Sequence, residues 1–222
     1  LVKRFPTVHN YSIEDSLEPK LVWLQERLSL DDKSLIKLVR KLPAVLWYTI
    51  EANLEPKLSW LQERLSLDDK SLSKLVREGP GVLGYSIENN LDPKLSWLQD
   101  RLSLDDKSLS KLLQTLPSLL SYSIEDNLKP KLSWLHERLS LDDKSLSKLV
   151  QTSPSVLGLS IEDNLEPKLS WLQERLSLDD MTLSKLVRRW PAVLSLSIEE
   201  NLEPKLSWLQ ERLQIDSKSL SK

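Results

Sequence analysis

The chain has 222 residues, a formal net charge of −2 and no cysteine. The lack of cysteine excludes disulfides and thiolate metal sites, and the near-zero charge is unusual for a nucleic-acid binder. The sequence contains no run of 18 apolar residues, so it predicts no membrane-spanning helix. The first residues fit neither a signal peptide nor a transit peptide. The two histidines, His9 and His136, have no neighbouring metal-ligating partner in the sequence.

One pattern recurs every 37 residues along the chain. Its tryptophan stands at Trp23, Trp60, Trp97, Trp134, Trp171 and Trp208, and two columns at the same period hold all twelve prolines. A period of this size is typical of a repeat array, in which each unit buries its apolar face on its neighbours. The sequence therefore predicts one array of six units over residues 1–222. Both ends interrupt the same helix and the chain opens on Leu1, so we expect a fragment of a longer array; a designed or trimmed chain is the alternative.

The unit that starts at Pro154 illustrates the expected elements. Residues 154–159 are too few for a full helix and predict a turn or 3₁₀ segment. Ser160 and Asp163 resemble a capping box. Asn164 is the preferred N-cap of the first long helix, because Pro167 then falls in the first turn, where the missing N–H costs little.

Two amphipathic helices follow from the leucine spacing. The first runs to about Leu176 with an apolar stripe at i, i+4, i+7 and i+11, and Lys168 and Arg175 flank the stripe on the side of Trp171. The second begins at Asp179, a good N-cap. The chain is thus predicted to be all-α, a helical-repeat solenoid with helices of roughly 11–13 and 8–11 residues per unit and no strands.

A basic ridge lies opposite the apolar face of the second helix and forms the candidate nucleic-acid-binding surface. Together with two variable glutamines, the candidates are Lys37, Arg40, Lys70, Lys74, Arg77, Lys107, Lys111, Gln114, Lys144, Lys148, Gln151, Lys185 and Arg188. One phosphate contact per repeat gives a salt slope near −4 to −5 for duplex DNA. The alternative is that the ridge is only a solvated outer face.

Sequence differences between the copies concentrate at the end of the second helix and in the short turn. One such column reads Lys3, Arg40, Arg77, Gln114, Gln151, Arg188. Fixed scaffold columns beside a few variable ones are the pattern of modular nucleic-acid readers, although unrestrained surface drift gives a similar pattern. The tryptophan column also has two interpretations: it closes the seam between repeats, or it stacks on bases beside the cations.

The unit resembles the repeat of the mitochondrial transcription termination factor (mTERF) family, most clearly over residues 117–132, where Asn127-Leu128-Lys129-Pro130-Lys131-Leu132 stands in register with the second proline. The resemblance covers all six units. It implies two α-helices and a 3₁₀ helix per repeat, stacked as a curved superhelix with a positively charged concave groove. It also implies nucleic-acid binding, with double-stranded DNA favoured over RNA, and a role in transcription termination or transcript processing in mitochondria or chloroplasts. The family commonly has glycine between the helices, where this chain has Ser66, Ser103, Ser140 and Ser177.

The leading hypothesis is a monomeric, non-catalytic nucleic-acid-binding solenoid without cofactor or metal. The alternative is a protein-interaction scaffold that uses the solenoid groove, which the balanced charge favours. An enzyme is not expected, because every Ser, Asp or Glu suited to chemistry recurs in several repeats and no unique constellation builds a site. Recurrent pairs such as Asp105-Asp106 are explained by their position at a helix N-cap.

Overall fold

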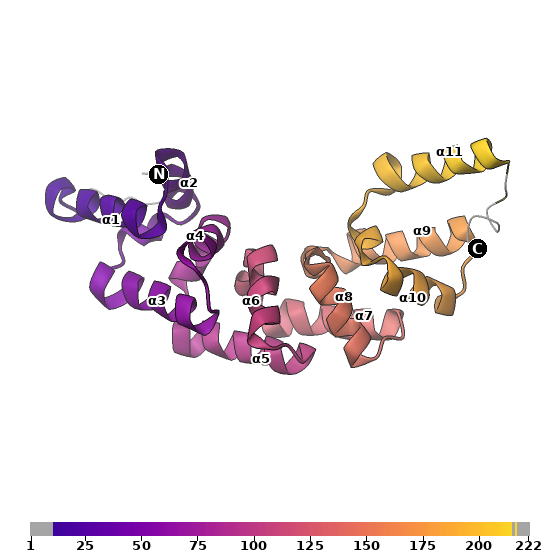
Figure 1. Cartoon of the computed structure of the whole chain (residues 1–222), viewed down its shortest axis with the longest axis horizontal. Coiled ribbons are helices and arrows are strands. Elements are labelled where there is room, and N and C mark those ends of the chain that lie inside the picture. Colours follow the sequence, from indigo (N-terminus) through magenta and orange to yellow (C-terminus); the bar gives the residue numbers. More distant parts are fainter. Residues whose placement is uncertain (1–10, 215, 217–222) are drawn as a thin grey trace. The chain divides into compact units, whose positions relative to one another are not determined.

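The computed structural model describes residues 11–214 and 216, and these residues form helices and turns without any β-strand. The predicted all-α helical-repeat fold is confirmed. In chain order, each of the four repeats that begin at Pro43, Pro80, Pro117 and Pro154 contributes a 3₁₀ turn, a π-helical turn, a first α-helix and a second α-helix. Figure 1 labels the α-helices. The chain divides into two compact units, Leu1–Tyr122 and Ser123–Lys222. The assignment of all six repeats to one array stays a prediction, and Pro6, His9 and residues 219–222 lie outside the described residues.

The first unit contains α1 to α6 and the second contains α7 to α11. The first helices are α1 (Glu18–Leu28), α3 (Glu55–Arg64), α5 (Asp92–Leu102), α7 (Lys129–Arg138), α9 (Glu166–Leu176) and α11 (Glu203–Leu213). The second helices are α2 (Asp32–Lys41), α4 (Asp69–Glu78), α6 (Asp106–Thr115), α8 (Asp143–Thr152) and α10 (Asp180–Arg189). The 3₁₀ turns are η3 (Pro43–Leu46), η5 (Pro80–Gly84), η7 (Pro117–Ser121), η9 (Pro154–Gly158) and η11 (Pro191–Ser195). The π turns are η2 (Ile13–Leu17), η4 (Ile50–Leu54), η6 (Ile87–Leu91), η8 (Ile124–Leu128), η10 (Ile161–Leu165) and η12 (Ile198–Leu202).

The second helices begin where the sequence predicts. The Asp179 carboxylate accepts a hydrogen bond from the Thr182 N–H at 2.7 Å, and the corresponding aspartate caps each of the other second helices. This contact satisfies one of the N–H groups that a helix leaves without an intrahelical partner. The residue after each helix precedes a proline and has left the α-helical region, as the steric demand of the following ring requires.

A π turn precedes the first α-helix, so the helical segment begins earlier than predicted although α9 itself starts at Glu166, and the assignment of Asn164 as the N-cap is wrong. Ser160 is the cap: its hydroxyl accepts from the Asp163 N–H at 3.1 Å, and a π turn over Ile161–Leu165 leads directly into α9. The Leu165 N–H bonds back to the Ser160 carbonyl, one residue farther than in an α-helix. In an ordinary α-helix the ring of Pro167 would clash with the carbonyl four residues earlier. We infer that the wider turn relieves this clash.

The link between the two helices depends on a left-handed residue. Ser66, Ser140 and Ser177 have φ values of 49°, 46° and 52°, and Ser29 and Ser103 adopt the same conformation. This conformation turns the chain so that the next N–H reaches the carbonyl five residues before it, as in the 2.9 Å bond from Leu67 to Gln62. A residue with a Cβ pays a steric cost for this conformation, whereas glycine does not.

Replacing Ser66 by glycine is therefore expected to raise the free energy of unfolding by about 0.5–1 kcal/mol, because relief of left-handed strain outweighs the extra backbone entropy of glycine. Urea unfolding measures the change. Ser96→Gly is the matched control, since Ser96 lies exposed inside α5 and glycine there should destabilise by about 0.5 kcal/mol. A loss of stability in both variants would contradict the explanation.

The predicted apolar stripes form the core. Leu165, Leu169, Leu172 and Leu176 are all buried, as are Leu183 and Val187 of the second helix. In the first unit α2 contacts α4 and α4 contacts α6, and the turns η3, η5 and η7 follow one another in contact. Successive second helices of this unit therefore pack directly on one another. The first helices α1, α3 and α5 form a second row beside them (Figure 1).

Candidate nucleic-acid interface

Three groups of basic side chains recur along the described residues, and two of these groups are engaged by the fold. The first group is the lysine that follows the proline in the first helices α1, α3, α5, α7 and α9. Lys57 donates to the Leu83 carbonyl and Lys94 to the Leu120 carbonyl, both at 2.6 Å. Each acceptor lies near the end of the 3₁₀ turn 26 residues later. The same bond recurs from Lys20, Lys131 and Lys168 to the carbonyls of Leu46, Leu157 and Leu194.

These lysines act as staples between repeats. Lys57 and Lys94 are buried, and burial lowers the pKa of both ammonium groups. Their charge meets a carbonyl dipole and an aromatic face, since Lys94 lies 5.4 Å from the ring centre of Tyr85. The sequence places Lys168 on the same side of the helix as Trp171, and the Lys168 ammonium bonds a backbone carbonyl of the next repeat. These ammonium groups are consequently unsuited to phosphate binding.

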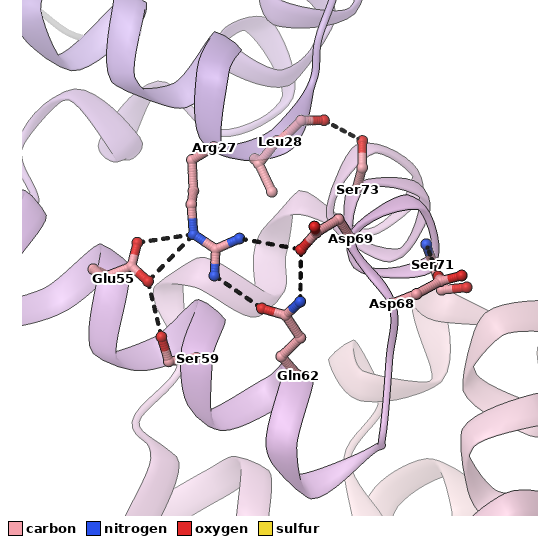
Figure 2. A network of polar contacts seen from close by, with 9 residues as sticks. All are labelled: Arg27, Leu28, Glu55, Ser59, Gln62, Asp68, Asp69, Ser71 and Ser73. Atoms are coloured by element: carbon pink, nitrogen blue, oxygen red, sulfur yellow. Dashed lines mark hydrogen bonds and ion pairs between the residues drawn. The ribbon is translucent and has the colours of Figure 1, made fainter.

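The second group is the arginine near the end of each first helix. Arg27 lies at the centre of a network that Figure 2 shows: its guanidinium is 2.9 Å from a carboxylate oxygen of Glu55 and 2.9 Å from the amide oxygen of Gln62. It also lies 3.7 Å from Asp69, which accepts a hydrogen bond from Gln62 at 2.7 Å. One arginine therefore connects α1 to both helices of the following repeat.

The arginine network recurs within each unit. Arg64 contacts Asp92, Gln99 and Asp106. Arg138 contacts Glu166, Gln173 and Asp180, and Arg175 contacts Glu203 and Gln210. The hydrogen bond from Arg138 holds the pKa of the Glu166 carboxyl below its usual range. Sequence reasoning missed this network, although its signal is present: acidic and glutamine columns follow the arginine by 28 and 35 residues.

The third group is the ridge of the second helices, where the candidate binding residues lie. All of them are exposed except Gln114, which is partly buried. The ridge is thus a surface feature, in contrast to the staples and the arginine network. In the first unit Lys37, Lys74 and Lys111 stand at equivalent positions of α2, α4 and α6, which pack in succession.

The ridge cations differ in their surroundings. The side-chain ammonium groups of Lys37, Lys74, Lys111 and Lys148 form no hydrogen bond or ion pair within the described part of the chain. The positive charges of Arg77 and Arg188 act on the N-cap aspartates of the preceding second helices, Asp31 and Asp142. Hydrogen bonds from Ser34 lower the pKa of the Asp31 carboxyl, and the bond from the Ser34 side chain has a larger effect than the bond from its backbone N–H. The positive charges of Lys33 and Arg77 lower this pKa further. Hydrogen bonds from Ser145 likewise lower the pKa of the Asp142 carboxyl, and the positive charge of Arg188 adds to this effect.

The tryptophan column is partly buried rather than fully buried or fully exposed. Trp23, Trp60, Trp97, Trp134 and Trp171 are intermediate in exposure, whereas Trp208 is 61% exposed. Trp208 lies on α11, the last described helix, where Leu213 is exposed although its counterpart Leu176 is buried. The tryptophans of α1 to α9, which further described repeats follow, are therefore less exposed than Trp208. This difference favours the interpretation that the tryptophan closes the seam between repeats.

The described residues hold no cluster of three or more His, Cys, Asp or Glu side chains arranged as metal ligands. Among the same residues, no helix combines the length and apolar character that crossing a bilayer requires.

Stacked two-helix units with an exposed basic ridge define a helical-repeat protein. The family model of mTERF matches residues 1–220, and the chain belongs to the mTERF family. This family comprises nucleic-acid-binding helical-repeat proteins of organellar gene expression. A search of curated proteins found no match.

Proposed function

We propose that this chain binds double-stranded DNA through the ridge of its second helices and acts in organellar transcription termination or transcript processing. The family membership supplies the class of ligand. The proposal further assigns a mitochondrial or chloroplast location, a monomeric state and no catalytic activity to this chain.

The proposal rests on a difference between the basic side chains: some bond other repeats of the chain, and others are exposed without such a bond. Buried lysines such as Lys94 bond backbone carbonyls, and arginines such as Arg27 bond carboxylates and amides of the next repeat. The lysine column at Lys37, Lys74, Lys111 and Lys148 has no such partner in the described residues. Exposed ammonium groups repeated once per unit suit a ligand with regularly repeated negative charge.

The near-zero net charge is compatible with this proposal. Acidic residues gather at the π turns and first helices, for example the exposed Glu162 and Asp163 beside Ser160. The second helices also open with exposed aspartate pairs such as Asp105 and Asp106, whereas the lysine column that includes Lys111 lies more than one turn farther along each helix. A charged ligand responds to the local field near its contact surface, because screening removes more distant charges beyond about 8–10 Å at physiological salt.

A protein-interaction scaffold is the second candidate. It is favoured by the proximity of Arg77 and Arg188 to N-cap aspartates, which gives parts of the ridge a mixed charge. A mixed surface of this kind fits a polar protein partner better than a polyanion.

Replacing Lys111 by glutamine is expected to weaken binding to all duplexes alike and to reduce the magnitude of the salt slope by about 0.9, because one phosphate contact is lost. The measurement is fluorescence anisotropy with random-sequence duplexes at several salt concentrations. Lys129→Gln is the matched control: it also removes one exposed positive charge, but from the first helix α7, where Lys129 pairs with Glu125.

The expected slope for the unaltered chain is about −4 to −5, which corresponds to about one contact per repeat. Equal effects of Lys111→Gln and Lys129→Gln would show that binding follows net charge and not the ridge. Absence of any binding at micromolar protein and low salt would exclude the DNA proposal for this chain and leave the scaffold ahead.

A further inference from the structure

The last turn of each second helix carries a column that varies between only two residue types in the described repeats. This last-turn column consists of Arg40, Arg77, Gln114, Gln151 and Arg188. The lysines three residues earlier do not vary: Lys37, Lys74, Lys111, Lys148 and Lys185. Residues at i and i+3 share one face of a helix, so each last-turn residue lies beside a ridge lysine. Within each compact unit, a ligand held by the lysine column therefore also passes the last-turn column.

The glutamines of this column are held in place by the fold. The Gln114 amide nitrogen donates to the Ser110 hydroxyl at 3.1 Å, and the Gln151 amide nitrogen donates to the Ser147 hydroxyl at 2.9 Å. Both serines are buried. The bond occupies one N–H of the amide and leaves its carbonyl oxygen and second N–H for another partner. A side chain that is already ordered loses less entropy when it binds.

Two arginines of the column interact electrostatically with an aspartate of a neighbouring repeat. The charge of Arg77 acts on Asp31, and that of Arg188 acts on Asp142, in each case the N-cap of the preceding second helix. A guanidinium presents five donors in a planar fork, so it can donate two parallel hydrogen bonds to one partner. Both residue types thus present a bidentate polar group next to a column of lysines.

We propose that the last-turn column reads base edges in the major groove, with arginine at guanine and glutamine at adenine. The proposal rests on the DNA-binding function proposed above and adds the residues that set sequence preference. Guanine presents two acceptors, N7 and O6, which match the arginine fork, whereas adenine presents an acceptor at N7 and a donor at N6, which match the remaining amide groups of glutamine. The lysine column supplies affinity without selecting sequence, because phosphates are the same at every base pair.

The test is selection of bound duplexes from a random-sequence DNA library by the full chain and by Gln114→Arg. We expect the variant to change the preferred base pair at one position from A·T to G·C, with a change of about tenfold in relative affinity for the two duplexes. Arginine already occupies this column at Arg77 and Arg188, so the repeat accommodates it.

Thr115→Arg is the matched control for charge. It adds the same charge one residue farther along the last turn, in a column that carries Arg189 in another repeat. This control should tighten binding to all duplexes without changing the preferred bases. Ser110→Ala tests the anchor: it should reduce the preference for A·T at the same position, while affinity for duplexes that lack the preferred base pair stays the same. Unfolding midpoints of all variants confirm that they are folded.

The outcomes separate the two proposals. If the unaltered chain binds duplexes with the expected salt slope but Gln114→Arg and Thr115→Arg behave alike, the reading column is wrong and the DNA-binding function stands. If the chain enriches no duplex and Lys111→Gln has no effect, both proposals fail. If Gln114→Arg changes the preferred base while Thr115→Arg does not, the assignment of the column is supported.

Discussion

Replacing Lys94 by methionine is expected to lower the free energy of unfolding by about 2 kcal/mol, because the buried Leu120 carbonyl loses the donor that the ammonium supplies at 2.6 Å. Methionine keeps most of the apolar stem, so the packing change is small. Two effects oppose each other: removal of a buried charge relieves its desolvation cost, whereas an unsatisfied carbonyl stays buried. We expect the second effect to dominate, since Lys94 also bonds Asn90 at 3.3 Å and faces the Tyr85 ring.

Urea unfolding followed by circular dichroism measures this loss. Lys129→Met is the control, because Lys129 is exposed and makes only a surface ion pair with Glu125, so its replacement should change stability by less than about 1 kcal/mol. Equal stability of Lys94→Met and the unaltered chain would show that the staple contributes no net stability.

The same staple has a signature in pH dependence. Burial lowers the pKa of Lys94 in the folded chain below its value in the unfolded chain. Between those two pKa values the unfolded state binds more protons, so stability should rise as pH increases through this window towards about 10.4. The desolvation cost is fully present below the folded pKa and is gone above the unfolded one. The rise should be smaller in Lys94→Met, and the difference between the two proteins isolates this residue from other groups that titrate at high pH.

Local features of the fold follow from the sequence more fully than contacts between repeats do. The N-cap at Asp179 and the leucine stripes depend on neighbours within a few residues, and both are confirmed. The start of the first helix is not predicted correctly. A capping serine and a following π turn resemble an ordinary helix start displaced by one turn, and rules based on an α-helical first turn place Pro167 too early.

The polar contacts between repeats escape such reasoning for a different reason. The acceptor of Lys94 is a backbone carbonyl, which carries no residue-specific signal, and it lies 26 residues away rather than one period. The candidate interface was predicted from the amphipathic pattern of the second helix, and its residues lie at the surface as that pattern requires. Sequence alone could not separate the lysines that bond the fold from those whose ammonium has no partner among residues 11–214, because both kinds recur at the 37-residue period.

Replacing Trp60 by alanine is expected to cost about 2–3 kcal/mol of unfolding free energy, less than the 3–5 kcal/mol typical of a fully buried aromatic residue. Trp60 is partly buried in the middle of the first unit, so truncation removes apolar contact area and leaves a gap beside α3. Trp208 occupies the same position on α11 but is 61% exposed, and Trp208→Ala should therefore cost less than about 1 kcal/mol. Urea unfolding of both variants gives the difference.

DNA binding of these two variants distinguishes the seam from a stacking platform. If the tryptophan column closes the seam, Trp60→Ala under conditions where it remains folded should bind random duplexes with an unchanged salt slope, because no phosphate contact is removed. If the column stacks on bases, Trp208→Ala should weaken binding most, since its ring is the most exposed of the six, while its stability stays the same. Weak binding together with unchanged stability in Trp208→Ala would overturn the seam assignment, whereas a large stability loss in Trp60→Ala alone would place the column's role in the stacking of repeat on repeat.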